Sequence, residues 1–318
     1  MDGALDPWPP LRLADWKPTC ETLHRYAQIV GKIRLGLAPP LNHWWHVPLY
    51  VSARGLTTSA IPWRDGSFEI AFDLLAHELG VTTSAGDRVR LPLGPRSVAA
   101  FHAEVLAMLA SLGIEVHVWR MPVEIPDPIP FDEDEVHRSY DPASATRFFR
   151  VLSSAAAVLE GFAGRFVGKQ SRVHFFWGSF DLALTRFSGR RAPPRPGADR
   201  VTAEAYSHEV MSVGFWPGTE GVTDAAFYAY AAPEPPGFRD APVPPPGRWH
   251  ATLSEFVLPY ADVRALPSPR AAILAFCQAA YEAAAELGHW DRAALDRAPL
   301  PAPSGPGVLA HAPEQPTP

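Results

Sequence analysis

The feature of this chain that most constrains its fold is a recurrence, because the same order of secondary structure is expected twice. Each half begins with an amphipathic helix, continues with several strands and closes with a second long helix. A repeat of this size fixes the architecture of a whole domain, so the order of elements outweighs composition as evidence. The alternative is that two ordinary segments share this order by chance.

Hydrophobic periodicity and turn signals place the elements. The first half is expected to contain a helix through residues 23–33, strands at 43–52, 56–63 and 67–72, a strand ending at 91–92, a helix at 97–112 and a short strand at 116–119. The second half is expected to contain a helix at about 145–162, strands at 174–183, 208–216, 227–231 and 253–257, and a helix at 269–287. His43-Trp-Trp matches His174-Phe-Phe, and Leu91-Pro92 matches Leu258-Pro259.

These elements predict an α+β fold of two diverged α-β-α repeats. We expect mainly antiparallel sheets with helices packed on one face of each, and the sequence leaves open whether there are two sheets or one continuous sheet. The predicted boundaries are a first repeat at 1–120, a connector rich in proline and acid at 121–142, a second repeat at 143–298 and a disordered proline-rich tail at 299–318.

Composition narrows the class of protein. The chain has 318 residues, of which 47% are hydrophobic and 19% charged, which is typical of a globular protein. The net charge of −6 predicts neither a nucleic-acid nor an anionic-membrane partner. No stretch of apolar residues is long enough to span a membrane. Two distant cysteines, Cys20 and Cys277, and an N-terminus without an apolar signal core favour the cytoplasm.

Several familiar motifs are missing from the sequence. There is no Gly-x-Gly-x-x-Gly after a strand, no Walker A loop, no Gly-x-Ser-x-Gly elbow and no Cys-x-x-Cys. Nucleotide-cofactor enzymes and serine hydrolases of the common kinds are therefore disfavoured, and the cofactor is unknown.

Strand alternation sorts the segment from residue 176 to 185 into two faces. The apolar face, expected in the core, carries Phe176, Phe180, Leu182 and Leu184. The other face carries Trp177, Ser179, Asp181, Ala183 and Thr185, and the matching face of the first repeat carries His46, Pro48, Tyr50 and Ser52. A semi-polar, aromatic face of this kind either lines a ligand pocket or meets water.

Basic residues gather around the same segment: Lys169, Arg172, Arg186, Arg190 and Arg191. The functional interpretation is capture of an anion or carboxylate. The alternative is a solvated loop with ordinary ion pairs. His174, at the start of a strand, is either a binding residue or a hydrogen-bonded structural histidine.

The pair His208-Glu209 opens the next strand. Because neighbouring strand residues point to opposite faces, the two side chains are not expected to act on one atom. General acid–base work by His208 is chemically reasonable, since histidine titrates near neutrality. A metal site joining His208 to His174 or Asp181 lacks the spacings typical of such sites, so no metal is predicted.

The acidic connector, Phe131 to His137, is expected to be a solvated loop followed by a helix that Asp141 caps with Pro142 at its first position. The rival interpretation is a lid that carries His137, Tyr140 and Asp141 over the site.

Long segments at 168–183, 185–190, 204–209 and 214–218, together with Asn42-His-Trp-Trp45 and the Pro-Ile-Pro-Phe131 connector, carry a family likeness. On these segments the chain resembles a bacterial family catalogued only as a domain of unknown function, number five-nine-nine-six. The resemblance covers about Trp16 to Asp296 and implies one architectural unit. It implies no activity.

We expect a cofactor-independent enzyme that acts on a small polar or anionic molecule in a pocket between the repeats. The candidate catalytic residues are His208, Glu209 and Asp181. The candidate substrate-binding residues are Trp177, His174, Arg186, Arg190, Lys169, His46 and Tyr50. The alternatives are a non-catalytic protein that binds a small molecule or a partner and, less favoured, a structural subunit.

Overall fold

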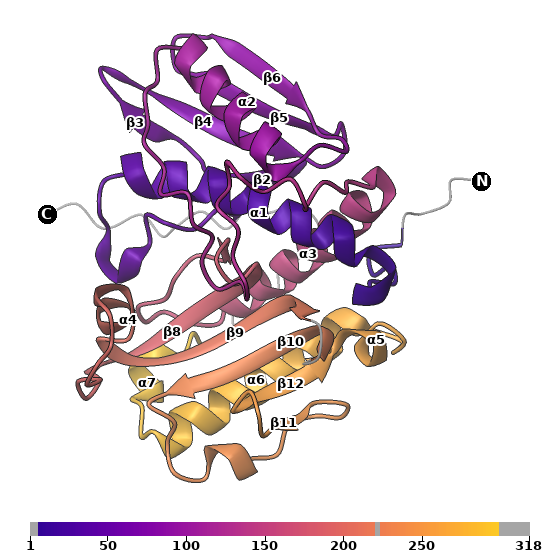
Figure 1. The fold of residues 1–318 in the computed structure, drawn as a ribbon. Helices are drawn as coiled ribbons and strands as arrows, with labels where there is room; N and C mark the ends of the chain where they lie inside the picture. The colour runs from indigo at the N-terminus through magenta and orange to yellow at the C-terminus, as the bar shows by residue number, and fades with distance from the viewer. Residues whose placement is uncertain (1–5, 220–222, 299–318) are drawn as a thin grey trace, which may run out of the picture.

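The protein folds into two antiparallel sheets with long helices packed against them, in a computed structural model that describes residues 6–219 and 223–298 (Figure 1). This confirms the α+β class. The helices are α1 (Leu13–Leu37), α2 (Val98–Ser111), α3 (Pro142–Ala163), α4 (Arg200–Ala205), α5 (Tyr260–Val263), α6 (Pro269–Leu287) and α7 (Arg292–Leu295), with 3₁₀ turns η1 (Asn42–Trp44) and η2 (Phe238–Asp240). The tail predicted at 299–318 lies outside the described residues.

The N-terminal sheet follows a simple meander. Its strands are β1 (Tyr50–Val51), β2 (Gly55–Thr57), β3 (Ile61–Trp63), β4 (Gly66–Asp73), β5 (Glu78–Thr83) and β6 (Arg88–Pro92). They are ordered β1-β2-β4-β5-β6, and β3 pairs with a further part of β4.

The C-terminal sheet has longer strands. They are β7 (His174–Phe176), β8 (Asp181–Arg191), β9 (His208–Thr219), β10 (Thr223–Ala232), β11 (Arg248–His250) and β12 (Glu255–Pro259). Their order is β11-β12-β10-β9-β8-β7, with every neighbour antiparallel.

The two sheets are separate but touch at one point. Leu49, just before β1, pairs with Phe175 of β7 through two backbone hydrogen bonds of 2.9 and 2.8 Å. The structure thereby answers the question that the sequence left open, since it has two sheets with a single bridge between them. That the halves are copies of one ancestral unit stays a prediction, as do the domain boundaries.

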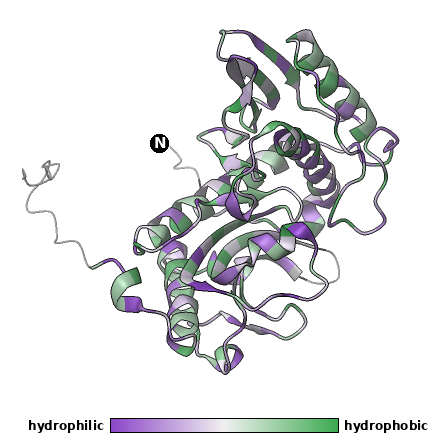
Figure 2. Ribbon diagram, turned by 90° about the vertical axis from the view of Figure 1, so that its left-hand side faces the viewer, coloured by the Kyte–Doolittle hydropathy of each residue, from purple (hydrophilic) through white to green (hydrophobic). Residues whose placement is uncertain are grey.

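One hydrophobic core runs through both halves. The helix-facing side of the C-terminal sheet is buried and apolar, with Leu182, Leu184, Met211, Val213, Phe215, Phe227 and Phe256 pointing toward α3 and α6. The long helix α1 lies between the two sheets and contacts α2, α3 and β9. Hydrophilic and hydrophobic residues are interspersed along the helices and strands of both lobes, as expected for elements with one buried face (Figure 2).

The predicted strand at 43–52 is wrong for most of its length. Residues 42–44 form η1, and only Tyr50 and Val51 pair as a strand. The reason is local, because His43 and Trp44 both have positive φ, at 56° and 60°, a conformation that interrupts strand pairing. The predicted strand at 56–63 is split in the same way at Ser59, whose φ is 52°.

The predicted strand at 174–183 is a hairpin. Residues 177–180 make the turn between β7 and β8, and Phe180 has a φ of 60°. Alternation therefore restarts at Asp181, and Phe176 shares a face with Asp181 rather than with Leu182. The predicted strand at 116–119 is irregular, while β5 and β11 were not predicted.

The long helices α2, α3 and α6 were predicted closely, whereas α1, Leu13–Leu37, begins well before and ends after the predicted 23–33. The helix expected at 269–287 has those bounds, and the helix expected at 97–112 is α2, capped by the Ser97 side chain, which accepts from the backbone N–H of Ala100 at 3.1 Å. Asp141 caps α3 as predicted, with Pro142 at the first helical position. Among the described residues, no helix is both long enough and apolar enough to cross a membrane.

Candidate functional site

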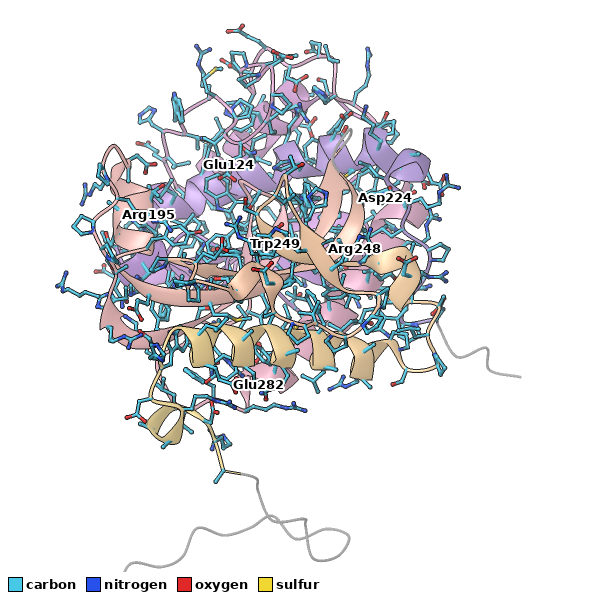
Figure 3. All side chains as sticks on the ribbon, turned by 90° about the horizontal axis from the view of Figure 1, so that it is seen from below. Glu124, Arg195, Asp224, Arg248, Trp249 and Glu282 are labelled. Carbon is cyan, nitrogen blue, oxygen red and sulfur yellow. The ribbon has the colours of Figure 1, made fainter. Side chains whose placement is uncertain are left out.

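The C-terminal sheet has two unlike faces. Helices α3 and α6 cover one of them. The opposite face, which we call the open face, carries His174, Phe176, Asp181, Ala183, Thr185, Ser212, Gly214, Tyr228, Tyr230 and Glu255 by strand register. Figure 3 shows Glu282, on α6, and Glu124, from the connector, on opposite sides of this sheet. The open face therefore carries polar side chains from several strands, on the side away from α3 and α6.

Asp181 is the buried acid of the open face. Its carboxylate accepts hydrogen bonds from the hydroxyls of Ser179 and Tyr228. The Tyr228 side chain comes from β10 and crosses β9 to reach it, passing over Gly214, which has no side chain to block the way. Burial raises the pKa of the Asp181 carboxyl and, with the Asp181 charge, that of the Tyr228 hydroxyl.

A second tyrosine runs parallel to the first. The rings of Tyr228 and Tyr230 are stacked 6.1 Å apart at an angle of 17°. The Tyr230 hydroxyl shares a hydrogen bond of 2.8 Å with the Tyr206 hydroxyl, and Thr185 and Ser212 share another of 2.8 Å below them. These contacts hold both rings in place, so the open face presents a rigid row of hydroxyls.

Two glutamates approach Asp181 from other segments. Glu255, at the start of β12, is half-buried, and burial together with the Asp181 charge raises its pKa to about 7. Glu124 lies in the connector against Gly178, where a Cβ atom would be 2.5 Å from its Oε1. Partial burial and the Asp181 charge raise the pKa of Glu124 as well. A carboxyl with a pKa near 7 exchanges its proton readily at neutral pH.

A cavity adjoins this cluster at Glu124. It has a volume of about 460 Å³ and lies between the first half of α1 and the connector. Its walls include Glu21, His24, Arg25, Glu124 and His137. Burial lowers the pKa of His24 to about 4, so its ring is neutral at pH 7.

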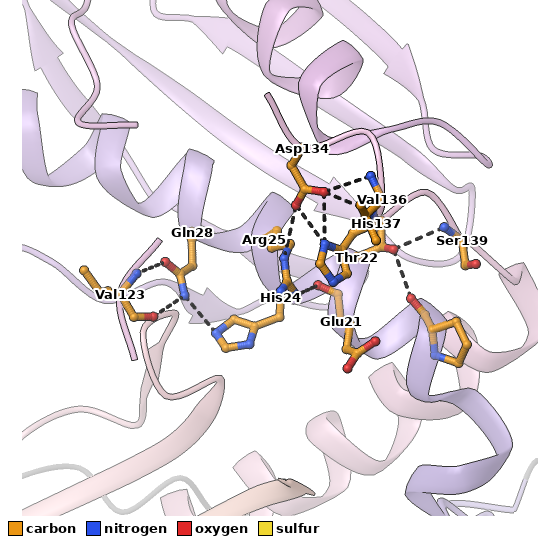
Figure 4. A network of polar contacts seen from close by, with 11 residues as sticks. Glu21, Thr22, His24, Arg25, Gln28, Val123, Asp134, Val136, His137 and Ser139 are labelled. Atoms are coloured by element: carbon orange, nitrogen blue, oxygen red, sulfur yellow. Dashed lines mark hydrogen bonds and ion pairs between the residues drawn. The ribbon is translucent and has the colours of Figure 1, made fainter. Parts of the chain in front are cut away.

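The connector wall of the cavity is fixed to α1 by a buried ion pair (Figure 4). The carboxylate of Asp134 lies 3.3 Å from Nε of Arg25 and 2.8 Å from Nδ1 of His137. It also accepts from the backbone N–H groups of Val136 and His137, at 3.1 and 3.0 Å. His137 is therefore a wall residue held by Asp134, and the lid interpretation stays a prediction.

Two predicted binding residues, His174 and Tyr50, meet where the two halves touch. The His174 ring lies 5.6 Å from Tyr50 and 5.9 Å from Trp45, and burial lowers its pKa to about 3. His46 is buried, stacks on Trp44 and accepts the backbone N–H of Leu41 at 3.1 Å. His174 lies on the open face and Tyr50 contacts it from the first half, whereas His46 packs against Trp44.

Two other predicted residues point away from the open face. Trp177 is buried against Gly31 of α1 and donates to the Val47 carbonyl at 2.9 Å. Arg186 is fully buried on the helix side, where its guanidinium stacks 3.5 Å from the ring centroid of Phe162. Burial lowers the pKa of Arg186 to about 10. Neither side chain is placed to touch a ligand on the open face.

Glu209 and Arg190 also lie on the helix side. Arg190 pairs with Glu209 at 2.7 Å and donates to the backbone carbonyls of Gly288 and His289, where α6 ends. The pair caps a helix, so its position fits a structural role. His208, one residue before Glu209, points to the open face, as strand alternation predicts, and its ring lies 5.6 Å from that of His43.

Sequence reasoning missed Tyr228, Tyr230, Glu255, Glu124 and His43. The two tyrosines alternate in Phe227-Tyr-Ala-Tyr-Ala231, and this polar-out pattern was the available signal. Glu255 and Glu124 had no comparable signal, since each reaches the site through long-range chain geometry.

No curated protein and no solved structure matches the chain. Among the described residues, no group of three or more His, Cys, Asp or Glu side chains is arranged to hold a metal ion. One family model matches residues 8–297, nearly the whole chain. The protein therefore belongs to the family of unknown function DUF5996.

Proposed function

We propose that the protein is an enzyme that transfers protons to and from a small polar molecule bound over the open face. The observation that carries the proposal is the gathering of Glu124 and Glu255 around Asp181, with Glu124 also in the wall of the 460 Å³ cavity. The three come from different segments, and none takes part in an ion pair among the described residues. Like charges gathered without a cation cost folding free energy, which argues for a functional reason.

Glu255 is the proposed acid–base group. Its pKa of about 7 means that the protonated and ionised forms are both populated at neutral pH. Asp181 is better suited to positioning, because each of its oxygens already accepts a hydroxyl. Tyr228 and Tyr230 supply a flat, hydrogen-bonded surface on which the substrate would rest.

The charge of the site indicates the substrate class. A cluster of carboxyls favours a ligand that brings N–H or O–H donors or a positive charge. An amine or a polyhydroxylated molecule fits this end of the open face. The proposed substrate is therefore polar, as expected from the sequence, and the group that it places next to Glu255 is a hydrogen-bond donor.

The test begins with native mass spectrometry and elemental analysis of the purified protein. A thermal-shift screen of small amines, amino acids and polyols follows. We expect a ligand whose stabilising effect is lost in Asp181→Asn and whose chemical conversion, followed by mass spectrometry of the mixture, is lost in Glu255→Gln. Glu135→Gln, at an exposed position in the connector, is the matched control.

The enzyme proposal is overturned if a ligand binds saturably and dissociates without any chemical change to the ligand. In that case the second candidate holds, a non-catalytic binding protein. The saturated hydrogen bonding of Asp181 favours that candidate, since groups that are already satisfied suit a fixed recognition surface.

We also propose a bacterial, cytoplasmic protein that arose by internal duplication and has no nucleic-acid partner. Its support is the family resemblance, the matched order of elements, the net charge of −6 and two free, buried cysteines. Fractionation of the native host and a nucleic-acid binding assay test these points.

A further inference from the structure

A second cluster lies at the far end of the open face, beyond Tyr230. It joins three segments: η1, the loop before β7 and the start of β9. Nζ of Lys169 lies 2.6 Å from Nε2 of His43, whose ring faces His208 at 5.6 Å. Asp181 and Phe187 are six residues apart on β8, and Lys169 contacts Phe187, so the cluster lies roughly 20 Å from Asp181.

The hydrogen bonds of His43 settle which of its nitrogens carries the proton. Nδ1 of His43 lies 3.1 Å from the backbone carbonyl of Glu204, which only accepts, so Nδ1 donates. Nε2 is then the acceptor for the Lys169 ammonium, and His43 is neutral. Burial lowers the pKa of Lys169, and as an ammonium that donates to His43 it has two further N–H groups for a ligand.

Lys169 and Arg191 bring positive charge to the cluster, and Nδ1 of His208 lies 3.1 Å from Oγ of Ser207. The Lys169 charge lowers the pKa of both His43 and His208, after burial, and Arg191 lowers that of His208 further. Lys169, Arg191 and His208 form no ion pair among the described residues. One acid lies at the edge of the cluster, since Oε1 of Glu204 accepts the backbone N–H of His43 at 3.2 Å.

Glu209, the acid next to His208 in sequence, points to the other face and pairs with Arg190. No carboxylate therefore neutralises the cluster from β9. An excess of positive charge on a partly exposed surface attracts an anion from solution.

The cluster has a built floor. Lys169 lies over the rings of Phe187 and Trp45, at 5.0 and 5.5 Å from their centroids. His43 and Trp44 both have a left-handed backbone, with φ of 56° and 60°, a conformation that non-glycine residues rarely adopt. This conformation turns the His43 ring toward Lys169 and leaves Trp45 beneath it.

We propose that Lys169 and His208 form an oxyanion subsite that binds a phosphate or carboxylate group of the ligand. This inference rests on the proposed function. The carboxyls near Asp181 bind a hydrogen-bond donor of the ligand, and Lys169 and His208 bind an anionic group of the same ligand. The ligand is then an elongated molecule with a polar or cationic group at one end and an oxyanion at the other.

Lysine is rare in this chain, which has only Lys17, Lys32 and Lys169, so a single substitution removes the only lysine of the subsite. The experiment titrates inorganic phosphate, and separately acetate, into the full-length protein by calorimetry. We expect Lys169→Gln to weaken phosphate binding by about tenfold or more, as for loss of a charge-assisted hydrogen bond, and Lys169→Arg to restore part of it.

Arg88→Gln, which removes one positive charge from the exposed end of the N-terminal sheet, is the charge-matched control and is expected to bind phosphate as the parent does. An NMR titration of the histidine C–H signals gives a second readout, in which phosphate raises the pKa of His208 in the parent and not in Lys169→Gln. The proposal is overturned if phosphate does not bind to the parent or binds equally to Lys169→Gln.

The two proposals fail separately. Glu255→Gln is expected to abolish turnover while leaving phosphate binding intact. Loss of the subsite with turnover retained removes only the present inference, and phosphate binding without any turnover removes only the enzyme proposal.

Discussion

The ring of Tyr228 lies across the backbone of Gly214. A Cβ atom at Gly214 would be 2.2 Å from Cζ of Tyr228 and 2.1 Å from the carbonyl oxygen of Leu182, so no other residue fits there. Through this contact the Tyr228 hydroxyl, on β10, reaches the carboxylate of Asp181, on β8. Because Gly214 has no side chain, a residue on β10 can reach across β9 and bond to a residue on β8.

Gly214→Ala should therefore cost on the order of 2–4 kcal/mol of unfolding free energy, because backbone and ring must both move. Urea denaturation measures the loss. Gly80→Ala, also inside a strand but with open space around it, is the control and should change stability by less than about 1 kcal/mol. Equal effects of the two substitutions would show that the crossing of Tyr228 is unimportant.

Glu255→Gln should make stability less dependent on pH. The pKa of Glu255 is raised to about 7 in the folded protein, so between pH 4.5 and 7 the folded state holds more protons than the unfolded state, and stability falls as pH rises. The Glu255→Gln variant has no carboxyl at this position, so this part of its unfolding free energy does not fall as the pH rises. It should match the parent at pH 4.5 and exceed it at pH 8 by on the order of 1–2 kcal/mol, in urea unfolding at both values. A parent that is the more stable protein at pH 8 contradicts the assignment.

Arg186→Met should leave the protein as stable as the parent or more so. Nε and Nη1 of Arg186 have no hydrogen-bond partner among the described residues, and a buried charge in that state is costly. Arg186→Ala should instead lose about 3 kcal/mol, because it leaves a cavity among Phe162, Phe166 and Tyr281. Thermal unfolding of both variants separates packing from charge, and a large loss in Arg186→Met would mean that the charge itself is needed.

Asp134→Ala should detach the connector from α1. The substitution leaves Arg25 buried without its anion, at a cost of about 3–5 kcal/mol. Hydrogen exchange of residues 121–140 should become faster. The control is Asp132→Ala, whose exposed ion pair with Arg120 is worth less than about 1 kcal/mol. Unchanged exchange in Asp134→Ala would show that the connector is held by other contacts.

The sequence predicted helices well and strand ends poorly. Ser97 and Asp141 are side-chain caps whose effect is confined to one turn, so helix starts could be located from local residues. The breaks at His43, Ser59 and Phe180 are positive-φ positions without glycine, which composition does not mark. Each break is maintained by tertiary contacts, such as that of Lys169 with His43.

The candidate site was predicted only in part, because local rules place some of its residues and long-range contacts place the others. Asp181, His174 and His208 lie on the open face because strand alternation is a local rule. Arg186 and Arg190 follow that rule too, but it directs them to the helix side, where packing and helix capping use their charge. Glu124 and Glu255 reach Asp181 from 57 and 74 residues away, as the differences 181 − 124 and 255 − 181 show, and no local pattern encodes such contacts.

The place of α1 between the sheets has a consequence for how the chain folds as it is synthesised. Residues 13–37 leave the ribosome before α2, α3 and β9, which contact them in the folded protein, and β9 ends only at residue 219. Helix α1 is therefore synthesised well before its packing partners, and its apolar surface stays exposed until β9 has been made. Chains with such distant contacts fold slowly and aggregate in the interval, so chaperone supply during expression should limit the yield of this protein more than its final stability does.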